Sequence, residues 1–257
     1  MKKDLVVIKI GTALLTDKNG LLKTAFLKRT CKEISTIKNS GWDVILVSSG
    51  AMASGAGVLK GTPHTIVERS LFACVGQPLL MNYYCSLLGT SGIVVAQALL
   101  TWQDFQDNEI RELLKKNIGT LLESDILPII NENDLTATEE ISFGDNDQLA
   151  AKVAVLFKAA KLVILSDVDG LYDKNPQEYP DAKRFETVRK ITDETIKYAG
   201  KKISKNSLGG MKSKLQAAKY ATENGVNVTI ASDISGRDTL VRVVLEGKIF
   251  GTQFLAQ

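Results

Sequence analysis

Short runs of Val, Ile and Leu recur along this chain and alternate with longer stretches of helical periodicity. The runs expected as strands cover residues 5–10, 44–47, 93–96, 126–130, 162–165 and 226–230. Helices are expected over residues 24–39, where Leu27, Cys31 and Ile34 fall at i, i+4, i+7, and around residues 67–88. Strands that are apolar on both faces are typical of parallel sheets covered by helices on each side. The pattern therefore predicts an α/β fold, a three-layer αβα sandwich with a mainly parallel central sheet.

The length of 257 residues suits one large domain with a sizeable core. No internal repeat or low-complexity segment occurs. The composition of the sequence changes after Phe157, where two prolines and a lysine-rich stretch follow. We expect a single domain over residues 1–257, built from two lobes, 1–157 and 158–257, that share one sheet.

Composition excludes several classes of function. A net charge of +3 is too small to indicate nucleic acid or an anionic membrane as partner. The three cysteines are widely spaced, which argues against a disulfide framework or a structural zinc site. No signal peptide core is present and no stretch is expected to span a bilayer, so we expect a cytoplasmic protein. His64, the only histidine, follows Pro63 in a loop and is expected to be exposed rather than catalytic.

Polar and glycine residues follow several of the expected strands directly. These clusters are Lys9 to Thr12, Ser48 to Ala51, Asn131 to Asp134 and Ser166 to Gly170. Any one of them could be ordinary turn chemistry, because Ser, Asn, Asp and Gly are standard turn residues. Parallel strands place their carboxyl ends on one edge, where ligands bind in open α/β sheets. Four such clusters together predict one shared crevice.

Lys9 is unusual because a strand covered on both faces rarely carries a lysine. One interpretation is that its side chain reaches water from a frayed strand end. The favoured interpretation is that it reaches a phosphate group across Gly11, where the missing side chain lets a ligand approach the backbone.

A second polar cluster, Gly144 to Asp147, opens the helical pattern of Leu149, Val153 and Leu156. Asp145 is equally well explained as a helix cap, since acidic residues are favourable there. Asp147 lies further into the first turn and is the better candidate for binding a metal or for orienting a lysine. The spacing fits no EF-hand, and we predict no protein-bound metal site here.

The run Leu208-Gly209-Gly210-Met211-Lys212-Ser213-Lys214 precedes another helical pattern and places lysines in its first turns. Lysines oppose the helix dipole there unless an anion lies nearby. The alternative is an exposed basic face. The P-loop, the dinucleotide-binding glycine motif and the protein-kinase motifs are all missing from the sequence, so a phosphoryl transferase would use a different cradle.

Taken together, the strand-end clusters, the Asn-Glu-Asn-Asp and Gly-Asp-Asn-Asp pair and the Gly209–Lys214 run resemble the amino acid kinase family over the whole chain. The resemblance implies ATP-dependent phosphorylation of the γ-carboxylate of L-glutamate, the first step of proline biosynthesis. It also implies a need for Mg²⁺ and assembly into dimers or tetramers; many members are inhibited by proline. The paired clusters point to glutamate, whereas the other motifs occur throughout the family.

Carried over position by position, the resemblance implies three groups of residues. Lys9 and Lys214 would flank the transferred phosphoryl group, with Asp147 orienting both. Ser49, Gly50, Asp134 and Asn146 would hold the glutamate. ATP would contact Lys9, Gly11, Ser166, Asp167 and the stretch Leu208, Gly209, Gly210, Met211, Lys212, Ser213 and Lys214.

The sequence differs from the family pattern in two respects, which limit how far family properties can be assigned to it. Leu208 stands where many members have a threonine, so a hydroxyl contact to ATP is lost at that position. Many bacterial members also continue into a C-terminal PUA domain, so properties attributed to that domain are not carried over to this sequence. Two alternatives stay open: another kinase of the family, acting on acetylglutamate, aspartate or a nucleotide monophosphate, and a non-catalytic sensor of amino acids or nucleotides on the same scaffold.

Overall fold

The computed structural model describes residues 3–136, 145–176, 178–199, 210–233 and 238–257. Its strands are β1 Leu5–Ile10, β2 Asp43–Ser48, β3 Val95–Leu100, β4 Leu127–Glu132, β5 Lys161–Leu165, β6 Thr187–Val188, β7 Asn227–Ala231 and β8 Thr252–Phe254. They form one eight-stranded sheet in the order β3-β4-β2-β1-β5-β7-β8-β6. Neighbours run parallel except β7 and β8, which pair antiparallel. The predicted α/β class with a mainly parallel sheet is confirmed.

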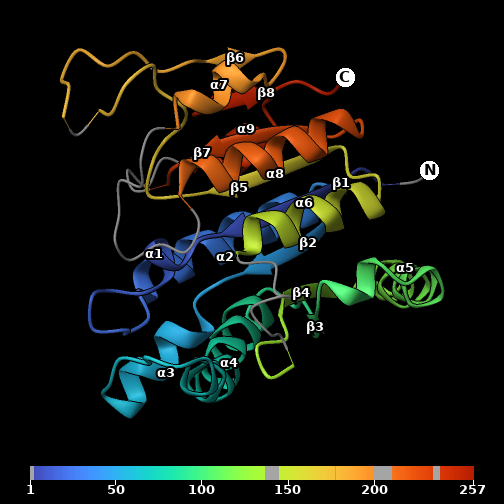
Figure 1. Ribbon diagram of the computed structural model, residues 1–257. Helices are drawn as coiled ribbons and strands as arrows, with labels where there is room; N and C mark the ends of the chain where they lie inside the picture. The colour runs from blue at the N-terminus through green and yellow to red at the C-terminus, as the bar shows by residue number, and fades with distance from the viewer. Residues whose placement is uncertain (1–2, 137–144, 177, 200–209, 234–237) are drawn as a thin grey trace.

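Helices cover both faces of this sheet (Figure 1). They are α1 Thr12–Leu15, α2 Thr24–Asn39, α3 Ala51–Leu59, α4 Ile66–Gly89, η1 Gln103–Phe105, α5 Asn108–Glu123, α6 Asn146–Leu156, α7 Asp193–Lys197, α8 Met211–Glu223 and α9 Thr239–Val244. One core packs α6 and α8 against alternate strand residues such as Val7 and Ile164. The other packs α2, α4 and α9 against the opposite strand residues, such as Ile8 and Val163. The sandwich is therefore three layers deep.

The strand predictions match the sheet interior closely and its edges less well. The strand expected at residues 93–96 lies at Val95–Leu100, because β3 is an edge strand whose partly exposed side chains blur the apolar pattern. Sequence reasoning missed β6 and β8, which are only two and three residues long. The short β8 lies between β7 and the edge strand β6, and its Phe254 is fully buried.

We expected no stretch that could span a bilayer. This expectation was wrong, because one helix has the length and the apolar composition of a membrane span. Helix α4 runs for 24 residues and is long and apolar enough to cross a membrane on those two criteria. In the structure, however, α4 packs against α3, α2 and β3. It buries Phe72, Leu80 and Tyr84 in doing so. The helix therefore buries one face against these elements, whereas Val67 and Leu71 on it are exposed.

Glycines at the contact between α3 and α4 let the two helices approach closely. A Cβ atom at Gly55 would lie 1.8 Å from the carbonyl oxygen of Phe72, and one at Gly76 would lie 1.8 Å from that of Ala51. Such distances are impossible without moving a backbone. The approach positions Gln77 and Tyr84, which reach from α4 to the end of β2 and β4.

We expect Gly76→Ala to destabilise the protein by about 1–3 kcal/mol, because the added methyl group must push α3 and α4 apart. The matched control is Gly119→Ala in the interior of α5, where a Cβ atom would meet nothing within 4 Å. That control should raise stability by about 0.5–1 kcal/mol through helix propensity. Chemical unfolding of both variants measures the difference, and equal stabilities would contradict the close-contact explanation.

Candidate active site

The polar clusters lie at the point in the sheet where successive strands stop being added on one side and begin to be added on the other. From β1 the chain passes to β2 on one side and later crosses to β5 on the other. The carboxyl ends of β1 and β5 therefore flank a topological switch point, the usual place for a ligand crevice in such sheets. In Figure 1 these ends lie near α1, away from the label that marks the N-terminus.

At this switch point one buried carboxylate faces two buried lysines. Lys9 Nζ lies 2.5 Å from Asp147 Oδ1, and Lys214 Nζ lies 3.0 Å from Asp147 Oδ2. The exposed fractions are 4% for Lys9, 0% for Asp147 and 7% for Lys214. The three residues come from β1, α6 and α8. Because Lys9 is buried, the alternative that its side chain reaches water from a frayed strand end is wrong.

The charges of this cluster support one another. Burial disfavours the ionised form of Asp147, but Lys9 and Lys214 outweigh that effect and hold the pKa of its carboxyl group below the usual range. Burial likewise disfavours the charged form of Lys214, and Asp147 outweighs it, so the pKa of this lysine is raised. Asp147 faces both ammonium groups, and the carboxylates of Asp145 and Asp167 also act on Lys214.

Asp147 is placed by the start of α6. Asp145 is the N-cap of this helix, and its Oδ1 accepts hydrogen bonds from the backbone N–H groups of Asp147 and Gln148. The cap interpretation of Asp145 is therefore confirmed. Burial, then the charge of Asp147, raises the pKa of Asp145. Gln148 Nε2 donates to the carbonyl oxygen of Ser213 at 3.2 Å and so ties α6 to α8.

Lys214 lies in the first turn of α8, which begins after Gly210. A lysine near the amino end of a helix is unfavourable unless an anion lies nearby. Here the anion is the carboxylate of Asp147, which pairs with Lys214. Met211 packs against the core, whereas Lys212 is exposed. Ser213 faces α6 through its contact with Gln148. Three residues singled out from the sequence, Gly144, Leu208 and Gly209, lie outside the residues that the structure describes.

Beside the lysines, the ends of β1 and β5 come close together. Gly11 donates its N–H group to the carbonyl oxygen of Leu165 at 3.2 Å, and a Cβ atom at Gly11 would lie 3.7 Å from Lys9 Nζ. A Cβ atom at position 11 would therefore make only ordinary van der Waals contact with the ammonium group. Ser166 is buried and donates from its hydroxyl group to Asp167. Asp167 is close enough to Lys214 to act on its pKa.

On the other side of the lysines, Asn146 joins the ends of β2 and β4. Its Nδ2 lies 3.1 Å from the carbonyl oxygen of Ser48, 3.1 Å from Ser49 Oγ and 2.7 Å from Asn131 Oδ1. Gly50 follows Ser49 with φ +98°, a left-handed conformation that favours glycine and turns the chain into α3. The clusters after β1, β2 and β4 thus lie together, as expected for parallel strands.

Asp134 lies two residues beyond β4, in the described part of the loop. Its carbonyl oxygen accepts a hydrogen bond from the hydroxyl group of Ser70 in α4. Burial, assisted by the neighbouring charge of Glu132, raises the pKa of its carboxyl group to about 6. No hydrogen bond between described residues joins the Asp134 side chain to Ser49 or Asn146.

The raised pKa of Asp134 predicts a pH-dependent effect on stability. A carboxyl group with a folded-state pKa of about 6, above its ordinary value of 3.8, stabilises the fold below pH 4 and loses that contribution as the pH rises through 6. Asp134→Asn removes this titration. Its melting temperature should therefore exceed that of the wild type at pH 8 and match it near pH 4. A variant less stable than the wild type at pH 8 would contradict the assignment.

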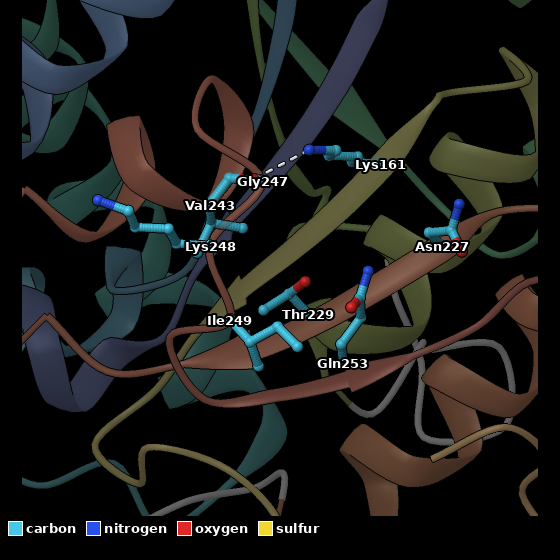
Figure 2. Close-up of a pocket in the computed structure, with 8 residues that line it drawn as sticks. All are labelled: Lys161, Asn227, Thr229, Val243, Gly247, Lys248, Ile249 and Gln253. Carbon is cyan, nitrogen blue, oxygen red and sulfur yellow. Dashed lines mark hydrogen bonds between the residues drawn. The ribbon is translucent and has the colours of Figure 1, made fainter. Parts of the chain in front are cut away.

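A separate pocket lies at the end of the sheet opposite to the lysine–aspartate cluster (Figure 2). It is lined by Lys161, Asn227, Thr229, Val243, Gly247, Lys248, Ile249 and Gln253. Lys161 and Asn227 are the first residues of β5 and β7, so the pocket opens at the amino ends of the strands. Lys161 Nζ donates to the carbonyl oxygens of Val243 and Val244 at the end of α9. This lysine caps a helix, and the pocket is remote from the lysine–aspartate cluster.

Sequence reasoning missed two residues that the structure connects to the site. Asn131 belonged to a cluster of interest but was not assigned a role, and Gln77 was not considered. A signal for Gln77 was present, because an amide interrupts the buried stripe of Ala73, Leu80, Met81 and Tyr84 on α4. Asn131 Nδ2 donates to Gln77 Oε1 at 2.8 Å.

Comparison with known proteins supports the fold and identifies a family. The family model described as "Amino acid kinase family" matches residues 4–232. The chain is 43% identical over 254 residues to "Glutamate 5-kinase 1" of Bacillus subtilis, covering 98% of this chain and 69% of the relative. It is 41% identical over 252 residues to "Glutamate 5-kinase" of Clostridium acetobutylicum, covering 97% of this chain and 94% of the relative.

Solved structures with the same architecture are more distant in sequence. The UMP kinase of Bacillus anthracis superposes with a TM-score of 0.66 at 15% identity, covering 98% of this chain and 96% of that chain. An isopentenyl phosphate kinase gives a TM-score of 0.66 at 17% identity, with 97% and 99% covered. At this level of identity the likeness concerns the fold alone.

Proposed function

The chain belongs to the amino acid kinase family, and from that membership we propose that it transfers the γ-phosphoryl group of ATP to the γ-carboxylate of L-glutamate. The product is L-glutamyl 5-phosphate, and the reaction is the first step of proline biosynthesis. The chain is thus an ATP-dependent kinase that acts on a carboxyl group. The names of the relatives support glutamate as the acceptor, and the family supports ATP as the donor.

The observation that carries the chemical part of the proposal is the buried Lys9–Asp147–Lys214 cluster. A γ-carboxylate oxygen is already an anionic nucleophile, so the reaction needs no general base. One of its oxygens forms a bond to the γ-phosphorus atom while the bond from that phosphorus to the ADP oxygen breaks, and the electron pair leaves with ADP. No proton moves in this step. His64, the only histidine, is exposed in the loop before α4.

Catalysis then consists of alignment and charge neutralisation. We propose that Lys9 and Lys214 flank the transferred phosphoryl group and neutralise charge on its oxygens. Asp147 holds both ammonium groups in place without approaching the substrate itself. Fixed donors of this kind cost no reorganisation during the reaction, because their positions are set by β1, α6 and α8 beforehand.

The remaining predicted residues divide between the two substrates. We propose that Ser49, Gly50, Asp134 and Asn146 hold the glutamate within residues 1–157. Residues 158–257 supply most of the nucleotide site through Ser166, Asp167 and the 208–214 segment, with contributions from Lys9 in β1 and from Gly11 directly after it. Support comes from Gly11, Ser49 and Ser166, which directly follow the neighbouring parallel strands β1, β2 and β5.

We propose that Mg²⁺ enters as the MgATP complex. Within the described residues there is no group of three or more His, Cys, Asp or Glu side chains that could hold a metal ion. Both oxygens of Asp147 already face lysines. A magnesium ion held mainly by substrate phosphates and water fits such a site. We further expect a cytoplasmic homo-oligomer, with proline as a candidate feedback inhibitor.

A trapping assay tests this function. The protein is incubated with ATP, Mg²⁺ and hydroxylamine, which converts an acyl phosphate into a hydroxamate, and with a panel of carboxylic acids. We expect hydroxamate with L-glutamate. Product with aspartate or acetylglutamate only would reassign the acceptor within the family, and phosphorylation of a nucleotide monophosphate alone would do the same. The absence of ATP turnover with every acceptor would favour a sensor.

A further inference from the structure

Three buried amide side chains form a continuous hydrogen-bonded chain from α4 to the acceptor side of the site. Gln77 Oε1 accepts from Asn131 Nδ2 at 2.8 Å, and Asn131 Oδ1 accepts from Asn146 Nδ2 at 2.7 Å. Their exposed fractions are 7%, 3% and 8%. The three residues lie on α4, β4 and α6 and are separated by 54 and 15 positions in the sequence.

Backbone groups fix the direction in which the amides of Asn131 and Asn146 point. The N–H group of Glu132 donates to Asn131 Oδ1 at 2.9 Å, and a backbone N–H group cannot accept. The carbonyl oxygen of Ser48 accepts from Asn146 Nδ2, and a carbonyl group cannot donate. The oxygen of Asn131 therefore faces Asn146, and its nitrogen faces α4. A group at position 77 that accepts a hydrogen bond completes this arrangement.

The polarity of the chain determines what Asn146 offers to a substrate. Its nitrogen is committed to Ser48, Ser49 and Asn131. Its Oδ1 faces the other way, and no donor within the described part of the chain hydrogen-bonds to it. An acceptor that has no partner among the described residues and lies beside the lysine cluster suits a cationic donor group, such as the α-ammonium group of an amino acid.

Packing alone does not explain a glutamine at position 77. The residue shares the buried face of α4 with Leu80, Met81 and Tyr84, and a methionine of nearly the same length would fill the same space. A buried amide is unfavourable unless its hydrogen bonds are made. The hydrogen bond between the side chains of Gln77 and Asn131 connects this amide to the site.

We propose that Gln77 is a positioning residue for the acceptor amino acid. By accepting from Asn131 it holds the amide of Asn131 in the orientation that leaves Asn146 Oδ1 free for the α-ammonium group of the substrate. This inference rests on the proposed function, in that the acceptor is an amino acid.

The test compares Gln77→Met, which keeps the size and removes the acceptor oxygen, with Gln77→Glu, which keeps a carboxyl oxygen in the same place. In Gln77→Met we expect the KM for glutamate to rise by about tenfold or more, because a buried donor loses its partner. The KM for ATP and kcat should stay within about twofold, the scatter normal for sites outside a coupled network. Gln77→Glu should recover most of the loss. Asn82→Ala, an exposed amide on the same helix, is the matched control.

A substrate analogue separates positioning from general damage. Glutarate lacks the α-ammonium group, so its inhibition constant as a competitor of glutamate should be unchanged in Gln77→Met. Equal losses for glutamate and glutarate, or an unchanged KM for glutamate, would overturn the proposal. If Gln77→Met does not fold, Gln77→Asn keeps the amide one methylene group too short to reach Asn131 and should show the same selective loss. Failure of wild-type protein to use glutamate would instead refute the proposed function itself.

Discussion

Replacing either Lys9 or Lys214 with alanine should lower kcat by about 10²–10³-fold, the usual effect of removing one donor that stabilises charge in a transition state. Both ammonium groups are buried and held by one carboxylate, so water cannot take their place without reorganisation. The KM for glutamate should change much less, because neither lysine belongs to the proposed acceptor site. Steady-state kinetics in the hydroxamate assay separate the two quantities.

Lys219→Ala is the control for this experiment. It removes a lysine from the same helix, α8, but from its carboxyl-terminal half. Its kcat should match that of the wild type. Near-normal turnover in Lys9→Ala or Lys214→Ala would remove that residue from the catalytic machinery. A large rise in the KM for glutamate with unchanged kcat would instead move the lysine to the acceptor site.

Much of the fold is predictable from the sequence because the sheet interior imposes a simple pattern. The strands β1, β2, β4, β5 and β7 are covered on both faces, and their apolar runs mark them clearly. Helix α2 was predicted with its observed bounds, since its apolar residues follow the helical period. The short strands β6 and β8 carry too few residues for any period to be recognised.

The site was predictable in its parts but not in its pairings. A lysine in an apolar strand indicates a functional group, and Lys9 was found in this way. Its partner Asp147 follows it by more than a hundred residues, and no local pattern connects the two. The same holds for Gln77 and Asn131, which lie 54 positions apart on α4 and β4. Such contacts depend on tertiary packing, on which a single sequence gives no direct information.

The second large effect is expected for Asp147→Asn, which keeps the shape of the side chain and removes its charge. The variant buries two ammonium groups with no carboxylate between them, and breaking a buried ion pair in this way typically costs about 3–5 kcal/mol. For a chain of this size, that loss corresponds to a fall in melting temperature of about 6–20 °C. Turnover should fall as well, because the lysines lose their common anchor.

The pH dependence of the Asp147→Asn variant provides a further check. Without the carboxylate of Asp147, burial disfavours the charged form of Lys214 and lowers its pKa in the folded state, so the unfolded chain binds more protons. The stability of the variant should therefore rise as the pH is raised from 7 towards 10, the range over which an uncompensated buried lysine titrates. The wild type should show no such rise. Asp145→Asn, the same chemical change two residues earlier, should be nearly neutral, because asparagine also caps helices well.

A double variant separates the structural role of Asp147 from its catalytic one. Adding Lys9→Met to Asp147→Asn removes one of the two uncompensated charges and should restore part of the lost stability, since a buried charge cluster can be replaced by apolar groups of similar volume. Turnover should stay low, because the phosphoryl group still lacks a lysine. Chemical unfolding and the hydroxamate assay on the same preparations measure both effects. If stability is not recovered in the double variant, repulsion between Lys9 and Lys214 is not what destabilises the Asp147→Asn protein.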